Sequence, residues 1–294
     1  MECERKMKKK KVVIVSPTGM LGSMVYHILK EKYDLILLYR NKEHLEILDK
    51  VYGGVGKHTA IRFDLEELYK KYLRGGKNSE DLSIKDVDAV INCAGVIKPY
   101  ADRDPALTFF INSAFPQLLS SMYKEKLIQI TTDCVFNGIK HAPYNENSLK
   151  SSNDLYGLSK SLGEPSNQSL VLRTSIIGPE IHGFVSLISW LKKQTGEVTG
   201  FTNHYWNGIT TKQFALICNE IISHRKQYPK NGLFHIFSND ITKYEMLIKL
   251  KEKYKLTVTI KQKKADAIDR RLRTIYDFTK QLHIPNFDKM IEDL

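Results

Sequence analysis

The stretch "KVVIVSPTGMLGS", residues 11–23, decides the fold. It starts as a short, continuous apolar run, which is typical of a strand buried on both faces of a sheet. After Gly19 the apolar residues recur at helical spacing, as at Leu21, Val25 and Leu29. A glycine-containing turn between a buried strand and a helix brings a phosphate to the helix N-terminus. We therefore predict a nucleotide-binding unit here; the alternative is a glycine turn that binds no ligand.

Strands and helices alternate through the first part of the chain. Apolar, β-rich runs predict further strands at 34–39, 59–65, 87–95, 126–131 and 169–178, and helical patterns cover 19–33, 105–125 and 154–164. Such alternation indicates βαβ units and a parallel sheet that helices cover on both faces. We predict an α/β fold, namely a Rossmann-type doubly wound parallel sheet.

The pattern loosens after Gly178. We expect an amphipathic helix at 184–193, a polar-aromatic loop followed by a helix within 196–222, a strand at 232–238 and a helix at 243–254. Residues 1–178 are therefore predicted to form the NAD(P)-binding domain. Residues 179–294 mainly form a smaller C-terminal substrate-binding lobe, from which 232–238 returns to the sheet.

Composition limits the classes of partner. The formal net charge of +12 favours an anionic partner, although its lysines are spread along the whole chain and also fit a plain lysine-rich surface. No nucleic-acid-binding motif is present, so we expect no nucleic-acid partner. The cysteines, at positions 3, 93, 134 and 218, show no ligand spacing. We expect neither a disulfide framework nor a metal site.

The sequence predicts a cytoplasmic protein with no membrane partner. No apolar run approaches the ~20 residues of a membrane span. The start, "MECERKMKKKKVVIV", is basic and then apolar, but no small-residue cleavage site follows. We interpret it as a basic tail that runs into the first strand.

Residues after the predicted strands form a candidate cofactor site, because ligands of such sheets bind beyond the carboxyl ends of the strands. Gly19 and Gly22 match the last two glycines of a Gly-x-x-Gly-x-x-Gly loop, and Ser16 takes the first position. Arg40 follows the second strand, where NAD-binding folds usually carry an acid, so we favour NADPH and keep NADH as the alternative. The predicted cofactor-binding residues are Ser16, Thr18, Gly19, Met20, Leu21, Arg40, Asp64, Leu65, Ala94, Gly95, Tyr156 and Lys160.

Tyr156 and Lys160 lie four residues apart, so they share one face of a predicted helix. A free tyrosine titrates near ~10, and a neighbouring ammonium favours its phenolate and lowers its pKa. Such a tyrosine can protonate an alkoxide as hydride reaches a carbonyl carbon. Thr132, at the end of the preceding strand, can hold the carbonyl oxygen beside it.

The segments "TTDCVFNG" (131–138), "APYNENS" (142–148) and "NDLYGLSKSLGE" (153–164) resemble dTDP-4-dehydrorhamnose reductases and related nucleotide-sugar reductases of the extended short-chain dehydrogenase/reductase superfamily. "TGMLG", "LRTSIIG" and, more loosely, "DRRLRT" (269–274) are also similar. The resemblance implies that Thr132, Tyr156 and Lys160 are the catalytic residues. It also matches Asn112 to an asparagine of the superfamily's central helix, where a plain core role is the alternative.

The resemblance implies reduction of the 4-keto group of a nucleotide-linked 4-keto-6-deoxy sugar, in deoxysugar and polysaccharide biosynthesis. The partner would be a nucleotide-diphosphate sugar, and a homodimer is left open. A guanidinium matches phosphate geometry, so Arg270 or Arg271 is expected at the substrate diphosphate. The expected substrate-binding residues are Thr132, Asp133, Cys134, Tyr156, Trp206, Arg270 and Arg271.

Cys134 leaves a second reaction open. Related 4,6-dehydratases carry a glutamate where Cys134 follows Asp133, which argues against dehydration. Bifunctional 3,5-epimerase/4-reductases carry a cysteine at a similar point, and a thiol can move a proton beside a ketone. His182 and His204 are candidate partners for that role, but a buried, inert cysteine is the simpler alternative. A non-catalytic dinucleotide-binding regulatory subunit is a further alternative, against which the intact Thr132, Tyr156 and Lys160 argue.

Overall fold

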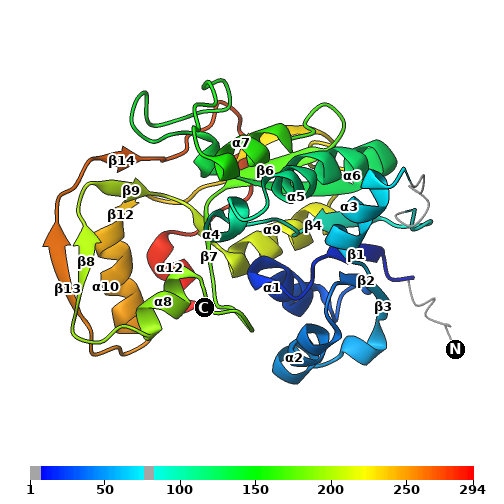
Figure 1. The fold of residues 1–294 in the computed structure, drawn as a ribbon, viewed down its shortest axis with the longest axis horizontal. Coiled ribbons are helices and arrows are strands. Elements are labelled where there is room, and N and C mark those ends of the chain that lie inside the picture. Colours follow the sequence, from blue (N-terminus) through cyan, green and yellow to red (C-terminus); the bar gives the residue numbers. More distant parts are fainter. Residues whose placement is uncertain (1–7, 76–82) are drawn as a thin grey trace, which may run out of the picture.

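The computed structural model describes residues 8–75 and 83–294, so residues 1–7 of the predicted basic tail lie outside the described residues. Its centre is a seven-stranded parallel sheet of order β11-β6-β5-β4-β1-β2-β3 (Figure 1). The strands are β1 (Lys11–Val15), β2 (Asp34–Tyr39), β3 (Thr59–Arg62), β4 (Ala89–Asn92), β5 (Leu127–Thr132), β6 (Leu170–Thr174) and β11 (Gly232–His235). Strand order reverses beside β1, which lies between β4 and β2. This confirms the Rossmann-type doubly wound sheet, and the strand predicted at 232–238 is β11.

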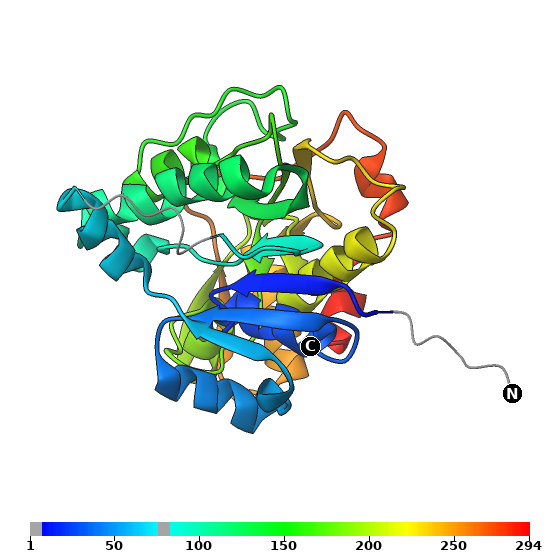
Figure 2. The same cartoon turned by 90° about the vertical axis from the view of Figure 1, so that its right-hand side faces the viewer.

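Helices cover both faces of the sheet (Figure 2). Val12 and Ile14 of β1 belong to the core under α1 (Met20–Leu29) and α9 (Thr211–Ser223). Val13 and Val15 face the opposite core, with residues of α3 (Leu65–Leu73) and α6 (Phe115–Tyr123). Side chains of the apolar run at 12–15 thus pack against helices on both faces of the sheet. This is expected of a strand whose residues do not alternate between apolar and polar.

Besides the short α4 (Lys98–Ala101), the helices α2 (Lys42–Tyr52) and α3 were not predicted from the sequence. Both α2 and α3 are rich in charged residues and have only a narrow apolar face. A local signal was present, because each helix begins after an N-cap residue of a favoured type. Asn41 accepts hydrogen bonds from the backbone of Glu43 and His44, and Asp64 accepts one from Glu66.

The helix predicted at 105–125 is interrupted. It consists of α5 (Pro105–Phe109), a π-helical turn (Phe110–Ala114) and α6. The π-turn carries Asn112, and turns of this kind occur frequently at functional sites. The other helices that the structure describes before residue 178 are α4 (Lys98–Ala101), α7 (Leu155–Leu162) and the short 3₁₀ turns Val55–Lys57, Lys124–Lys126 and Asp133–Val135.

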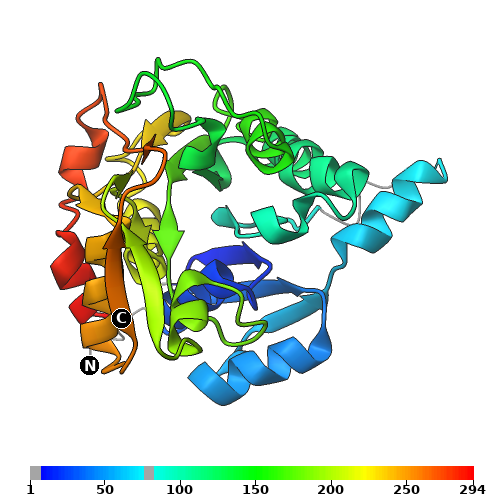
Figure 3. The same cartoon turned by 60° about the vertical axis from the view of Figure 1, so that its left-hand side comes forward.

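The second half builds a smaller set of sheets outside the main one. Figure 3 shows β13 (Thr259–Lys263) beside β8 (Glu197–Phe201), with which it pairs in parallel. β9 (His204–Trp206) lies between β12 (Ile241–Thr242) and β14 (Ile268–Asp269). β7 (Ile176–Ile177) pairs with β10 (Ile209–Thr210). The helices here are α8 (Leu187–Lys192), α10 (Lys243–Lys253), α11 (Phe278–Gln281) and α12 (Phe287–Glu292).

Two expectations about this half need correction. The polar-aromatic loop predicted ahead of α9 contains β8 and β9, because the exposed Glu197 and Thr199 alternate with the buried Val198 and Gly200 at the period of a strand. The strand predicted at 169–178 ends at Thr174 in the main sheet, and the chain then leaves to pair with β10. No helix of the described residues is long and apolar enough to cross a bilayer.

A buried ion pair joins two strands of the large sheet to the segment after α7. Arg173 on β6 forms two hydrogen bonds with the carboxylate of Glu164, at 3.0 and 2.7 Å, and both side chains are only 2% exposed. Its third nitrogen lies 2.8 Å from Nε2 of His235 on β11. The guanidinium therefore connects the segment after α7 with β6 and with the returning strand.

Arg173→Met is expected to lower the free energy of unfolding by about 3–5 kcal/mol, because it leaves Glu164 as a buried carboxylate without its main partner. Lys150→Met is the matched control, since Lys150 pairs with the same carboxylate but is 41% exposed. Its expected cost is at most about 1 kcal/mol. Urea unfolding measures both, and equal losses would contradict this account of the pair.

Candidate functional site

A cavity of about 1000 Å³ opens at the carboxyl ends of the central strands. Its volume is at the upper end of the range for small-molecule and cofactor sites, ~300–1000 Å³. Residues that follow β1, β2, β3, β4 and β5 all line it. Among them are all the predicted cofactor-binding residues: Ser16, Thr18, Gly19, Met20, Leu21, Arg40, Asp64, Leu65, Ala94, Gly95, Tyr156 and Lys160.

The turn after β1 packs closely against the start of α1. A Cβ atom at Gly22 would overlap the backbone carbonyl of Ser16, so only glycine lets α1 start this close to the turn. Ser16 itself has φ +60°, a left-handed conformation that glycine adopts more easily. It therefore adopts the backbone of the glycine it replaces, and its N–H donates to the carbonyl of Leu38. Gly19 begins α1 without a side-chain cap, which leaves the first N–H groups of the helix for an anion.

The three predicted catalytic residues line the same cavity. Thr132 ends β5, and its Oγ1 accepts the backbone N–H of Cys134 and donates to the Asp133 carboxylate, both at 3.1 Å. Tyr156 and Lys160 lie on α7, whose N-cap Asp154 accepts the Gly157 N–H at 2.8 Å. The end of a strand and the start of a helix thus bring a hydroxyl, a phenol and an ammonium to one place.

Asn112 connects this helix to the loop after β4. Its side chain donates to the Ser159 hydroxyl and the Val96 carbonyl at 3.0 Å, and it accepts the Val96 N–H at 2.9 Å. Gly95 permits the packing, because a Cβ there would overlap Nζ of Lys160. Asn112 therefore holds α7 and the 95–96 loop together, and both contribute cavity residues.

Burial controls protonation at the predicted catalytic residues Tyr156 and Lys160. We expected Lys160 to lower the pKa of Tyr156, but the pKa of Tyr156 is raised, because desolvation outweighs the hydrogen bond to Thr132 and the thiol of Cys134 adds to the rise. Burial also lowers the pKa of Lys160 to about 8. At neutral pH this leaves a protonated phenol beside a cation that is close to its titration range.

Cys134 lies in the cavity as a protonated thiol. Burial, helped by the charge of Asp133, raises its pKa to about 12, and burial also raises the pKa of Asp133. The two histidines named as partners for an epimerase role make other contacts. His182 lines the cavity but stacks on His44, and His204 on β9 contacts the Asp266 carbonyl outside the lining residues.

Three predicted substrate-binding residues are not among the described residues that line the cavity. Trp206 is buried behind it, with Nε1 donating to the Ser175 hydroxyl at 2.8 Å. Arg270 donates to the carbonyls of Phe136 and Asn137, so it holds the turn after the catalytic strand. Arg271 lies between two carboxylates, those of Asp269 and Asp240.

Two cavity segments were missed from the sequence. One is 96–108, which includes Tyr100 and Arg103, and the other is 175–188, which includes Glu180. The first could have been found, because it continues directly from Ala94 and Gly95 beyond the end of β4. The second had no such signal, since it enters the cavity only because the chain leaves the main sheet after Thr174.

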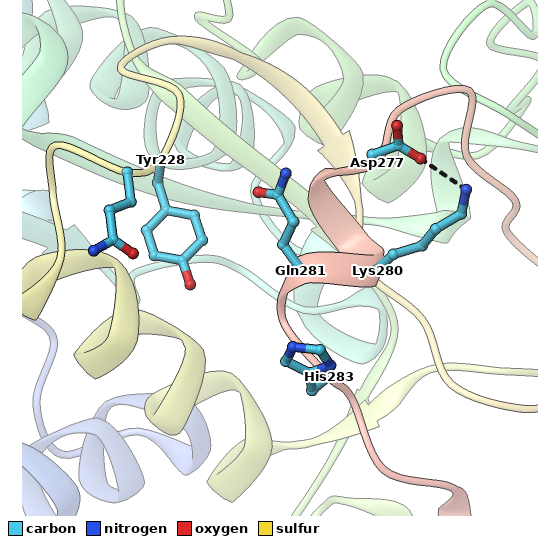
Figure 4. Close-up of a pocket in the computed structure, with 6 residues that line it drawn as sticks. Tyr228, Asp277, Lys280, Gln281 and His283 are labelled. Carbon is cyan, nitrogen blue, oxygen red and sulfur yellow. Dashed lines mark hydrogen bonds and ion pairs between the residues drawn. The ribbon is translucent and has the colours of Figure 1, made fainter.

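A second hollow lies at the surface near α11 (Figure 4). Its lining is polar, and its one lysine, Lys280, is already paired with Asp277 at 2.7 Å. None of the residues predicted for the site lies there. The lining consists of Gln227, Tyr228, Asp277, Lys280, Gln281 and His283.

Solved structures share this fold over almost their whole length. A dTDP-4-dehydrorhamnose reductase from Bacillus anthracis in complex with NADP is 19% identical, with 98% of each chain covered and a TM-score of 0.68. A UDP-N-acetylglucosamine 4-epimerase from Methanobrevibacter ruminantium in complex with UDP-N-acetylmuramic acid is 15% identical, with a TM-score of 0.72 over 98% of this chain and 97% of that one.

Sequence comparison adds two matches. The spore coat polysaccharide biosynthesis protein SpsK of Bacillus subtilis (strain 168) is 27% identical over 184 residues, which is 59% of this chain and 63% of that protein. The chain thus matches less than two thirds of the length of this curated relative. The model of the RmlD substrate binding domain family matches residues 10–272, which is most of the chain. The chain therefore belongs to the RmlD substrate binding domain family.

Proposed function

We propose that the protein is an NADPH-dependent reductase of the 4-keto group of a nucleotide-linked 4-keto-6-deoxy sugar. The observation that carries the proposal is that Thr132, Tyr156 and Lys160 share one cavity with the turn after β1 and with Arg40. The names of the relatives support it, since they include a dTDP-4-dehydrorhamnose reductase with NADP and a polysaccharide biosynthesis protein. NADH stays the alternative cofactor.

The residues fit a dinucleotide. The turn at 16–22 offers uncapped N–H groups at the start of α1, and Arg40 offers a cation after β2. Bound there, the cofactor would supply hydride to the ketone carbon. We assign the substrate lobe to most of 179–294, with α9 and β11 contributing to the dinucleotide-binding half.

The chain's own residues supply the proton and hold the oxygen. The raised pKa of Tyr156 keeps its phenol protonated, which suits donation to the oxygen of a ketone undergoing reduction. Lys160 places a positive charge close to where negative charge develops. Thr132, at the end of β5 in the same cavity, would orient the carbonyl.

The two alternative functions, epimerisation and a non-catalytic regulatory role, are less well supported. Epimerisation by Cys134 needs a thiolate or a second acid or base, and the pKa of about 12 keeps the thiol protonated. His182 stacks on His44, and His204 hydrogen-bonds with the Asp266 carbonyl. A non-catalytic regulatory role would leave the joint placement of Thr132, Tyr156 and Lys160 without a purpose.

Tyr156→Phe removes the proposed proton donor and keeps the ring. We expect the rate of NADPH oxidation with a nucleotide-linked 4-keto-6-deoxy sugar to fall by about 10²–10⁴, while NADPH affinity changes little. The matched control is Tyr72→Phe, on the exposed side of α3, which should keep full activity. A Tyr156→Phe enzyme with more than about a tenth of the wild-type rate would remove Tyr156 from the proposal.

The pH profile tests Lys160. A lysine is charged below its pKa, and burial lowers the pKa of Lys160 to about 8. We therefore expect kcat/KM to fall as the pH rises through about 8. Lys160→Met should be weak at every pH and should lack this fall. A fall in kcat/KM only near pH ~10.4, the ordinary pKa of a lysine, would contradict the role assigned to Lys160.

Arg40 tests the choice of cofactor. Arg40→Ala should weaken NADPH binding about tenfold or more, because it removes charge-assisted hydrogen bonds to a ribose phosphate. NADH affinity should stay nearly unchanged. Lys50→Ala, at the exposed far end of α2, is the control for a general loss of positive charge. Fluorescence titration measures the affinity of the wild type and of both variants for NADPH and for NADH. Equal losses of NADPH and NADH affinity in Arg40→Ala would refute the role of Arg40.

A further inference from the structure

Two histidines from distant parts of the chain stack at the wall of the cavity. His44 lies in the first turn of α2, and His182 lies in the segment after β7. Their ring centroids are 3.7 Å apart with an angle of 16° between the planes, and both rings line the cavity. The stack thus joins the dinucleotide-binding half to the segment that leads into the second lobe.

His182 has a hydrogen-bonding atom with no partner. Its Nε2 is buried and makes no hydrogen bond within the part of the chain that the structure describes. An unsatisfied buried polar atom is costly, so its partner is expected to be a ligand or water. The backbone of Thr18, in the turn after β1, interacts with the same ring. The unpartnered atom therefore lies next to the loop that we assign to phosphate.

The charges around His182 favour an anion as that partner. Burial lowers the pKa of His182, and the neighbouring His44 and Arg40 lower it further, whereas Glu180 and the Thr18 backbone act in the opposite direction. Without ligand the ring is therefore neutral at neutral pH. A phosphate in the cavity would reverse this balance, since it stabilises an imidazolium and accepts its N–H.

We propose that the His44–His182 stack binds a phosphate of the dinucleotide and takes up one proton when it does so. The proton moves from the buffer to a ring nitrogen of the pair. Only one is expected, because two imidazolium rings at 3.7 Å would repel each other. The proposal rests on the proposed function, since it requires a dinucleotide in this cavity. Either the pyrophosphate or the ribose 2′-phosphate could be the anion.

Calorimetry of NADPH and NADH binding, in two buffers that differ in ionisation enthalpy, counts the protons. At about pH 7.5 a phosphate monoester, with a second pKa of ~6, is already dianionic, so any uptake belongs to the protein. We expect about one proton to be taken up by the wild type. His182→Gln should abolish the uptake and weaken binding about tenfold. His224→Gln is the matched control, because His224 lies at the end of α9 and is half exposed.

Comparison of NADPH with NADH shows which phosphate the two histidines bind. Uptake with both supports the proposal with the pyrophosphate as the anion, and uptake with NADPH alone supports it with the 2′-phosphate. No uptake by the wild type would overturn the proposal, as would uptake that persists in both His182→Gln and His44→Gln. Failure of the folded wild type to bind either nucleotide contradicts the proposed function itself, and thermal melting of each variant establishes that it is folded.

Discussion

The contact between α1 and the turn after β1 is the constraint on which the site depends. Gly22 lets the helix start against the carbonyl of Ser16, and this fixes where the first N–H groups of α1 point. Because β1 lies where the strand order reverses, the same turn opens into the cavity that residues after β4 and β5 line, among them Thr132 at the end of β5. A larger residue at 22 would move the helix away from the turn and separate the cofactor residues from Thr132 and Tyr156.

Burial then determines what these residues can do. In water, the ammonium of a lysine four residues from a tyrosine would favour the phenolate form of that tyrosine. In this cavity the loss of solvent is the larger effect, so the pKa of Tyr156 rises and that of Lys160 falls. The same effect leaves Cys134 as a thiol. The environment therefore favours a proton donor at Tyr156 more than a base at Cys134, which is consistent with reduction of a ketone.

Most of the sheet, and the cavity in which Thr132, Tyr156 and Lys160 meet, could be predicted because their signals are local. A buried parallel strand is a continuous apolar run, as at 12–15, and the spacing of Tyr156 and Lys160 appears within one helical turn. Contacts between distant segments carry no such signal. Arg270 is held by carbonyls more than a hundred residues earlier, and His182 meets His44 only after folding. The raised pKa of Tyr156 was missed for the same reason, since burial is a property of the folded chain.

The measurement that tests the central claim most directly follows hydrogen from cofactor to product. NADPH deuterated at the transferable position of the nicotinamide would be turned over with a nucleotide-linked 4-keto-6-deoxy sugar, and the product examined by mass spectrometry and NMR. The account predicts one deuterium at the former ketone carbon and, in a parallel reaction in deuterated water, no solvent deuterium at the two flanking carbons. Absence of transfer from the cofactor, or solvent deuterium at the flanking carbons, would contradict a simple 4-ketoreductase.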